Sequence, residues 1–175
     1  MTMCLVDNTF YSIVGVKKIN MKDIGKFLEE LRNLFPEVSI QALDANIVYG
    51  HEHIDQVLKI TLEAIKRKIT IAHKAEIDLL LRLSSTDQIS LALKYAGLKN
   101  GSPGCFIFFS KDKTKLAKTK SYIENVFSDK DNSIINANTI KRKIISERIG
   151  ISSANLFDDQ TFILYLVERA CLIMK

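Results

Sequence analysis

The sequence is poor in the residues that interrupt regular structure. Its 175 residues include two prolines, seven glycines and no tryptophan. Disordered linkers are rich in proline and glycine, and turn-rich all-β folds need the same residues between their strands. The scarcity argues against both. With 47% hydrophobic and 26% charged residues, the chain has the composition of a globular protein, and we expect residues 1–175 to form one domain.

Cysteine is scarce too, and its spacing excludes several site types. Cys4, Cys105 and Cys171 are far apart, and none belongs to a CxxC pair. This pattern argues against a disulfide framework or a zinc knuckle, and it is typical of a reducing compartment. The sequence also has no signal-peptide pattern and no run of about 18 uncharged apolar residues, the length a membrane span needs. We therefore expect a cytoplasmic protein without a membrane partner.

Motifs of catalysis and cofactor binding are missing as well. The sequence has no glycine-rich phosphate-binding motif of the GxxxxGK or GxGxxG type. His51 and His53 are two residues apart, so on a helix they point about 200° apart and cannot grip one metal ion together. His73 is tied to no nucleophile, and Glu76 and Asp78 form no convincing acid–base pair. The sequence thus predicts no catalytic residue, metal, cofactor or small-molecule substrate, and not an enzyme.

Hydrophobic periodicity predicts the secondary structure. Strands are expected at residues 11–16, 38–43 and, in the centre of the sheet, 105–109, with a weak fourth strand at 133–136. Helices are expected from a cap at Asn20 to Pro36, after Gly50, and over 88–96, 115–127, 139–148 and 158–174. Thr86 or Ser85 can accept bonds from the first amides of the helix at 88–96. The buried stripe of the helix after Gly50 is expected to be Ile54, Val57, Leu58, Leu62, Ile65 and Ile69. Residues 75–83 fit either period, but their leucines favour a helix. The result is an α/β (α+β) fold, a small mixed sheet of about four strands covered by six or seven helices.

The positive charge is concentrated in two stretches. Residues 57–75 carry five lysines and arginines against Glu63 alone, and residues 94–120 carry seven lysines against Asp112 alone. A basic face can recruit a polyanion such as RNA, although a merely solvated face is the alternative.

The last predicted helix is apolar almost all round. Residues 162–174 read FILYLVERACLIM, in which Glu168 and Arg169 are the only charges. A helix of this kind is buried on two sides. Either it is the central core helix, or one of its faces binds a partner. The candidate partner-interface residues are Phe162, Leu166, Ala170 and Ile173.

Several segments, taken in order, resemble the small, non-catalytic subunit of the KEOPS complex, the PRPK-binding-protein family. They are residues 22–32 (KDIGKFLEELR), 41–50 (QALDANIVYG), 52–54 (EHI) and 74–94 (KAEIDLLLRLSSTDQISLALK). Gln88 and Ile89 match the family's pattern after the leucine-rich segment, whereas Asp87 stands where the family often has arginine. The segment at 41–50 resembles archaeal members most.

The resemblance implies a role in tRNA modification. KEOPS installs a threonylcarbamoyl group on the adenosine beside the anticodon, and the small subunit binds the kinase-like ATPase subunit and recruits tRNA by its 3′ CCA end. Applied to this sequence, it implies an RNA-binding surface. The candidate RNA-binding residues are Lys66, Arg67, Lys68, Lys74, Arg82, Ser85 and Gln88. The alternative function is a protein-interaction or regulatory subunit that does not bind RNA.

Overall fold

The computed structural model describes residues 3–152 and 158–173. The chain divides into two compact units. The first, here the sheet unit, comprises Met1–Ala45 and Leu98–Ile134, and the second, the helical unit, comprises Asn46–Gly97 and Ile135–Lys175. Neither unit is one continuous segment of chain, and the expectation of a single domain stays a prediction.

The sheet unit is built on four strands: β1 (Cys4–Val6), β2 (Thr9–Val16), β3 (Ser39–Asp44) and β4 (Gly104–Ser110). Their order is β1-β2-β4-β3, so the apolar run at 105–109 lies in the centre of the sheet, as its sequence predicts. All strand pairs are antiparallel. The prediction of a mixed sheet is therefore wrong: β2 and β3 both run opposite to β4, and β1 reaches β2 through a hairpin.

The fourth strand is β1, and the prediction of a strand at 133–136 is wrong. Residues Asn132–Ile135 form a short 3₁₀ helix (η2) instead. The structure makes β1 possible through a two-residue turn between Val6 and Thr9, where Asp7 and Asn8 both have positive φ. Turns of this kind suit the twist of a hairpin, and Asp and Asn tolerate the left-handed conformation. A strand of three residues is too short to show periodicity.

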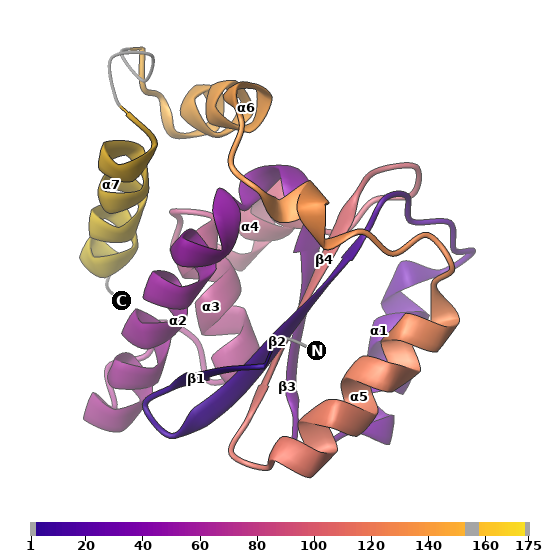
Figure 1. The fold of residues 1–175 in the computed structure, drawn as a ribbon. Helices are drawn as coiled ribbons and strands as arrows, with labels where there is room; N and C mark the ends of the chain where they lie inside the picture. The colour runs from indigo at the N-terminus through magenta and orange to yellow at the C-terminus, as the bar shows by residue number, and fades with distance from the viewer. Residues whose placement is uncertain (1–2, 153–157, 174–175) are drawn as a thin grey trace. The chain divides into compact units, whose positions relative to one another are not determined.

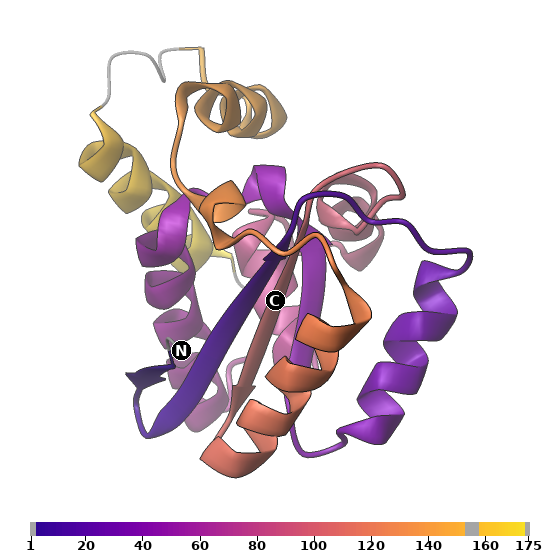
Figure 2. The same cartoon turned by 45° about the vertical axis from the view of Figure 1, so that its right-hand side comes forward.

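Helices α1 (Ile24–Leu34) and α5 (Lys113–Val126) cover one face of this sheet (Figure 1, Figure 2). The apolar residues of that face alternate along the strands, as a half-buried sheet requires. They pack against the inner faces of the two helices in one core: Val14, Val16, Ile40, Ala42, Phe106 and Phe108 from the strands, with Leu31, Leu116, Ile123 and Phe127. Helix α1 begins at Asp23, whose carboxylate accepts a bond from the Lys26 amide, and not at Asn20 as expected.

The helical unit contains α2 (Gly50–Arg67), α3 (Ala75–Leu83), α4 (Ile89–Ala96), α6 (Thr139–Ile149) and α7 (Asp159–Leu172). A 3₁₀ turn, η1 (Ala45–Ile47), precedes α2. The described residues thus hold seven α-helices, in agreement with the six or seven expected, and residues 75–83 are helical. In the part of the chain that the structure describes, no helix is long and apolar enough to cross a membrane.

The last turn of α2 differs from its predicted burial. Ile54, Val57 and Leu58 are buried, as the helical spacing predicts, but Ile65 and Ile69 are exposed. Lys68 adopts the left-handed conformation that ends the helix, with φ of 61°. Residues 65–69, which include three of the cations, are therefore all exposed, whereas Ala64 one position before them is buried.

Candidate nucleic-acid interface

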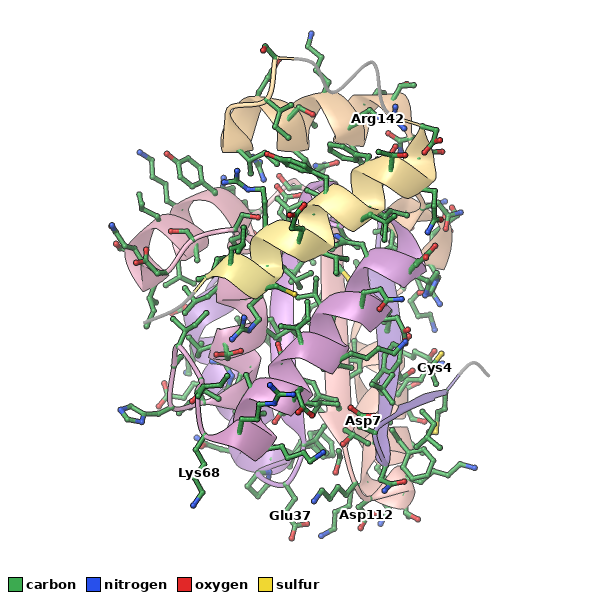
Figure 3. The ribbon with its side chains drawn as sticks, turned by 90° about the vertical axis from the view of Figure 1, so that its left-hand side faces the viewer. Cys4, Asp7, Glu37, Lys68, Asp112 and Arg142 are labelled. Atoms are coloured by element: carbon green, nitrogen blue, oxygen red, sulfur yellow. The ribbon has the colours of Figure 1, made fainter. Side chains whose placement is uncertain are left out.

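Three of the candidate RNA-binding residues lie together at the C-terminal end of α2. Lys66 and Arg67 belong to its last turn, and Lys68 is the C-cap. All three are exposed, and Figure 3 shows Lys68 projecting from this end of the helix. Cations are favourable here because the carbonyl end of a helix carries partial negative charge. The sequence thus places a cationic cluster on a helix end without a local electrostatic penalty.

Glu63 neutralises part of this cluster. Nε of Arg67 donates to its carboxylate over 2.5 Å, and Nζ of Lys66 lies 3.6 Å from the second oxygen. The hydrogen bond from Arg67, followed by the charges of Lys66 and Arg67, lowers the pKa of the Glu63 carboxyl. Among the described residues, Lys68 has no ion pair. The cluster therefore presents three cations against one carboxylate.

Lys74 lies at the same end of the α2–α3 pair. It is the N-cap of α3, its backbone is extended and its side chain is exposed. The loop between Lys68 and Lys74 is anchored at Ile71, whose amide donates to Oδ1 of Asp78 over 2.7 Å. In the described part of the chain Lys74, like Lys68, makes no ion pair. We call Lys66, Arg67, Lys68 and Lys74 the α2–α3 basic end.

Arg82 does not belong to this surface, and its prediction as an RNA-binding residue is wrong. It is 4% exposed, and its Nε donates to the wholly buried Asp78 carboxylate over 2.7 Å. Nη1 donates to the carbonyl of Ala170 on α7 over 2.8 Å. Buried charges are found paired and hydrogen-bonded, as here. Arg82 thus ties α3 to α7 and is not presented to a phosphate. The i, i+4 spacing of Asp78 and Arg82 within a leucine-rich helix is the signal that indicates this pair in the sequence.

Ser85 and Gln88 lie at the other end of α3. Ser85 has a positive φ of 51° and is partly buried in the turn before α4. Gln88 is the N-cap of α4, and its amide donates to the Thr86 hydroxyl over 3.2 Å, as the predicted cap requires. The Gln88 side chain is exposed and makes no capping bond. Its amide group can therefore donate to and accept from a base edge.

The structure thus divides the candidate set into two places. At about 1.5 Å of rise per residue, α3 separates the α2–α3 basic end from the Ser85–Gln88 turn by roughly 15 Å. A ligand that reaches both has to be extended along α3. A single-stranded nucleic acid has this form, with phosphates for the cations and base edges for Gln88.

The second basic stretch contributes less exposed charge than its sequence indicates. Lys120 is buried and pairs with Glu124 over 3.5 Å, and Lys115 pairs with Glu37 and Asp112. Lys111, Lys113 and Lys118 remain exposed on α5 and the loop before it. Two of the seven lysines in residues 94–120 are thus paired with carboxylates within the sheet unit.

Three of the four candidate partner-interface residues are in the core of the helical unit. Phe162, Leu166 and Ala170 are buried, and the Phe162 ring contacts the Tyr49 ring edge-on at 4.9 Å between centroids. The expectation that they meet a partner is corrected, because their own unit covers them. Ile173 is partly buried, and Met174 lies outside the described residues. The exposed apolar residues of α7 are Leu164 and Leu172, 57% and 68% exposed, eight positions apart on one face.

One polar cluster of the helical unit has no counterpart among the predicted site residues. Arg142 on α6 projects toward the first turn of α7, where it pairs with Asp159 (Figure 3). The Tyr49 hydroxyl donates to the same carboxylate and accepts from Nε of Arg142 at 3.0 Å. Burial, with the bond to Asp159, raises the pKa of Tyr49. These residues are 17 to 110 positions apart in the sequence, so no local motif announces them.

His53 is the second feature that spacing alone does not reveal. It is buried on α2, and its Nδ1 accepts a bond from the Tyr49 amide at 3.3 Å. Lys141 is also buried, and its Nζ donates to the carbonyl of Val48 over 3.0 Å. Burial, reinforced by the charge of Lys141, lowers the pKa of His53 to about 4. The neutral imidazole is thus a buried structural group, whereas His51 is exposed.

The described residues include no group of three or more His, Cys, Asp or Glu side chains placed to hold a metal ion. No family model and no curated protein sequence matches this chain.

Proposed function

We propose that this chain is a non-catalytic, RNA-binding subunit of a tRNA-modifying assembly, of the kind that the resemblance to the small KEOPS subunit implies. The α2–α3 basic end holds phosphates of the tRNA acceptor strand, and the Ser85–Gln88 turn receives its 3′ CCA end. Reaction chemistry belongs to other subunits, among them the kinase-like ATPase that the resemblance names as partner.

The observation that carries this proposal is the pairing state of the α2–α3 basic end. Lys68 and Lys74 flank one loop and, within the described ranges, have no carboxylate partner, while Lys66 and Arg67 share Glu63. When such cations neutralise phosphates, the counterions condensed on the nucleic acid are released, which gives an affinity that falls with salt. On α5, by contrast, Lys115 and Lys120 are paired with carboxylates, although Lys113 and Lys118 are exposed.

The Ser85–Gln88 turn supports the proposal independently. Gln88 is exposed at a helix start, with its amide group uncommitted to the cap. A side-chain amide can bond two atoms of one base edge, which charge alone does not. The lysines thus supply affinity for any tRNA, and Gln88 supplies a preference for the unpaired end.

The test is titration of tRNA with paired charge reversals. Lys68→Glu with Lys74→Glu removes two phosphate contacts, each worth about fivefold at 0.15 M salt, so affinity should fall about 30-fold. The salt slope should fall by about two. The matched control is Lys113→Glu with Lys118→Glu, which changes the net charge equally on α5.

Fluorescence anisotropy with end-labelled tRNA measures both variants. The proposal requires the first pair to lose affinity and the control to keep it within about twofold. Equal losses from both pairs would show attraction by net charge alone, and loss from the α5 pair only would move the site to the sheet unit.

A further inference from the structure

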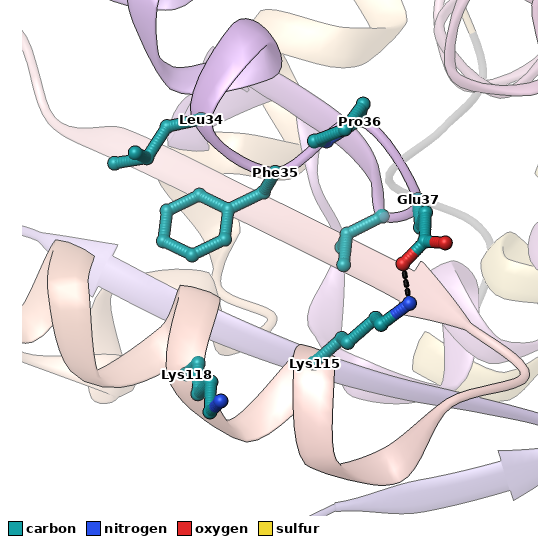
Figure 4. Close-up of a pocket in the computed structure, with 7 residues that line it drawn as sticks. Leu34, Phe35, Pro36, Glu37, Lys115 and Lys118 are labelled. Carbon is teal, nitrogen blue, oxygen red and sulfur yellow. Dashed lines mark ion pairs between the residues drawn. The ribbon is translucent and has the colours of Figure 1, made fainter.

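The sheet unit has a pocket between the end of α1 and the side of α5 (Figure 4). Its volume is about 230 Å³. Apolar side chains line it on the α1 side, and two lysines of α5 stand at its rim. The lining residues are Leu34, Phe35, Pro36, Glu37, Val38, Lys115 and Lys118.

The pocket continues along α5 as an apolar surface. Lys115, Lys118, Tyr122 and Val126 follow one another at i, i+3, i+7 and i+11, and therefore share one face of the helix. The Tyr122 ring contacts Phe35 edge-on, with 5.5 Å between centroids. Leu34, Tyr122 and Val126 are exposed, and Leu34 is the most exposed at 55%. Apolar residues that gather around a hollow, unlike scattered ones, mark a binding surface.

The charges at the rim are unequal. Lys115 is held by Glu37, as the dashed line in Figure 4 shows, and also lies 3.9 Å from Asp112. Lys118 is exposed and, among the described residues, has no ion pair. The rim thus offers one uncommitted cation beside an apolar hollow, with the Glu37 carboxylate on the opposite side.

This arrangement favours a peptide over a nucleic acid. The hollow is apolar, whereas phosphates need polar contacts, and one of its two lysines, Lys115, is already paired with Glu37. A volume of about 230 Å³ is also below the roughly 300–1,000 Å³ typical of small-molecule sites, and it suits one anchoring side chain. An Asp or Glu of the bound peptide, next to that anchoring side chain, would complement the charge of Lys118.

We propose that this pocket binds an acidic segment of a partner protein, which inserts one large apolar side chain between Leu34 and Phe35 and pairs a neighbouring Asp or Glu with Lys118. The surface is separate from the tRNA interface proposed above and does not depend on it. Its size places the contact among weak, exchangeable peptide interactions.

A phage library of random 12-residue peptides, selected on the immobilised full-length chain, is the test. The enriched peptides should carry acidic residues next to an aromatic or large aliphatic residue. A synthetic peptide of the enriched sequence, titrated by anisotropy, should lose about tenfold in affinity with Lys118→Glu. Leu34→Ser should cause a similar loss by removing the wall of the pocket.

Two matched variants control for charge and for apolar surface. Lys113→Glu makes the same charge change at the start of α5, and Leu164→Ser removes a leucine of nearly equal exposure, 57%, from α7. Both should bind the peptide within about twofold of the parent chain. All four positions are exposed, so circular dichroism and melting temperature should be unchanged.

Several outcomes would overturn the proposal. They are a selection that enriches no acidic peptides, peptide affinity that Lys118→Glu does not alter, and equal losses from Lys113→Glu. Loss of tRNA affinity with Lys118→Glu alone would identify the surface as an RNA site. A concentration-dependent dimer in sedimentation, abolished by Leu34→Ser, would identify a second copy of the chain as the occupant.

Discussion

The two units differ in how they use charged residues. In the sheet unit, the core between the strands and helices α1 and α5 is built of apolar side chains, and the buried charged residues among its described residues are Asp44 and Lys120. In the helical unit, the interior includes the Asp78–Arg82 pair, His53 and Lys141, all buried. The pair and Lys141 are bonded to other segments, whereas His53 accepts a bond from Tyr49 at the start of its own helix. The cations of the α2–α3 basic end, which belong to the same unit, are exposed on its surface.

This difference shows that a count of charges in the sequence does not locate a site. Lys120 adds to the positive charge of residues 94–120, and Arg82 is a candidate RNA-binding residue by sequence, but both are buried and paired. Lys68 and Lys74 count no more in the sequence, yet they are exposed and, among the described residues, have no ion pair. Burial and pairing, which only the fold decides, separate the charges held inside the protein from those that a ligand can reach.

The largest expected effect comes from breaking the buried pair of the helical unit. Asp78→Ala leaves Arg82 buried without its carboxylate and the Ile71 amide without its acceptor. Removing one partner of a buried pair costs about 3–5 kcal/mol of unfolding free energy. Its counterpart in the sheet unit is Glu124→Ala, which removes the half-exposed partner of Lys120 and should cost about 1 kcal/mol or less.

Urea unfolding of the two variants measures this contrast. A double variant, Asp78→Ala with Arg82→Met, should recover part of the loss, because it leaves no unpaired charge in the interior. If Asp78→Ala cost no more than Glu124→Ala, the buried pair would not be the anchor described here.

The second effect is a pH dependence that belongs to the helical unit, which contains all three histidines. His53 has a pKa of about 4 in the folded protein against 6.5 ordinarily, so the unfolded chain binds the extra proton between these values. Stability should therefore be full above about pH 6.5 and fall by about 3 kcal/mol as the pH drops to 4.

Urea unfolding at pH 7 and pH 5 tests this sign. His53→Gln, which cannot titrate, should flatten the dependence, whereas the exposed His73→Gln should leave it unchanged. If the pH dependence of the unfolding free energy persisted in His53→Gln, it would have to come from other titratable groups.

The smallest effect on stability is expected on the outer face of α7. Leu164→Arg changes an exposed position and should alter the unfolding free energy by less than about 0.5 kcal/mol. Phe162→Ala, on the inner face, should cost about 3–5 kcal/mol because it leaves a cavity against Tyr49. If Leu164→Arg prevents binding of a kinase-like partner in a pull-down and leaves the fold intact, α7 does contact that partner, through its outer face.

Long helices and strands were predicted from the sequence better than short ones, and the contacts between residues far apart in the chain were not predicted. The central strand β4 follows from a continuous apolar run, and the seven helices of the described residues, each at least eight residues long, were all expected. Strand β1 was not predicted, because three residues are too few to show a hydrophobic period and because its pairing depends on the turn at Asp7 and Asn8. Ile65 was predicted buried because spacing describes a face of a helix but not what covers it.

The candidate site was only partly predictable for the same reason. Lys66, Arg67, Lys68 and Lys74 come together because they flank one loop, which is a local property. Arg82 joins Ala170 across 88 positions, and Phe162 meets Tyr49, so their burial depends on long-range contacts that spacing does not contain.

The central claim is that the helical unit receives the 3′ end of tRNA at Gln88. The measurement that tests it most directly is the affinity of the parent chain and of Gln88→Ala for intact tRNA and for the same tRNA without CCA. We predict that removal of CCA from the tRNA lowers its affinity for the parent chain. Gln88→Ala should cost ~1–3 kcal/mol of binding free energy with intact tRNA, but almost nothing with tRNA that lacks CCA. Equal affinity of the parent chain for both tRNAs, or an equal loss by Gln88→Ala with both, would contradict it.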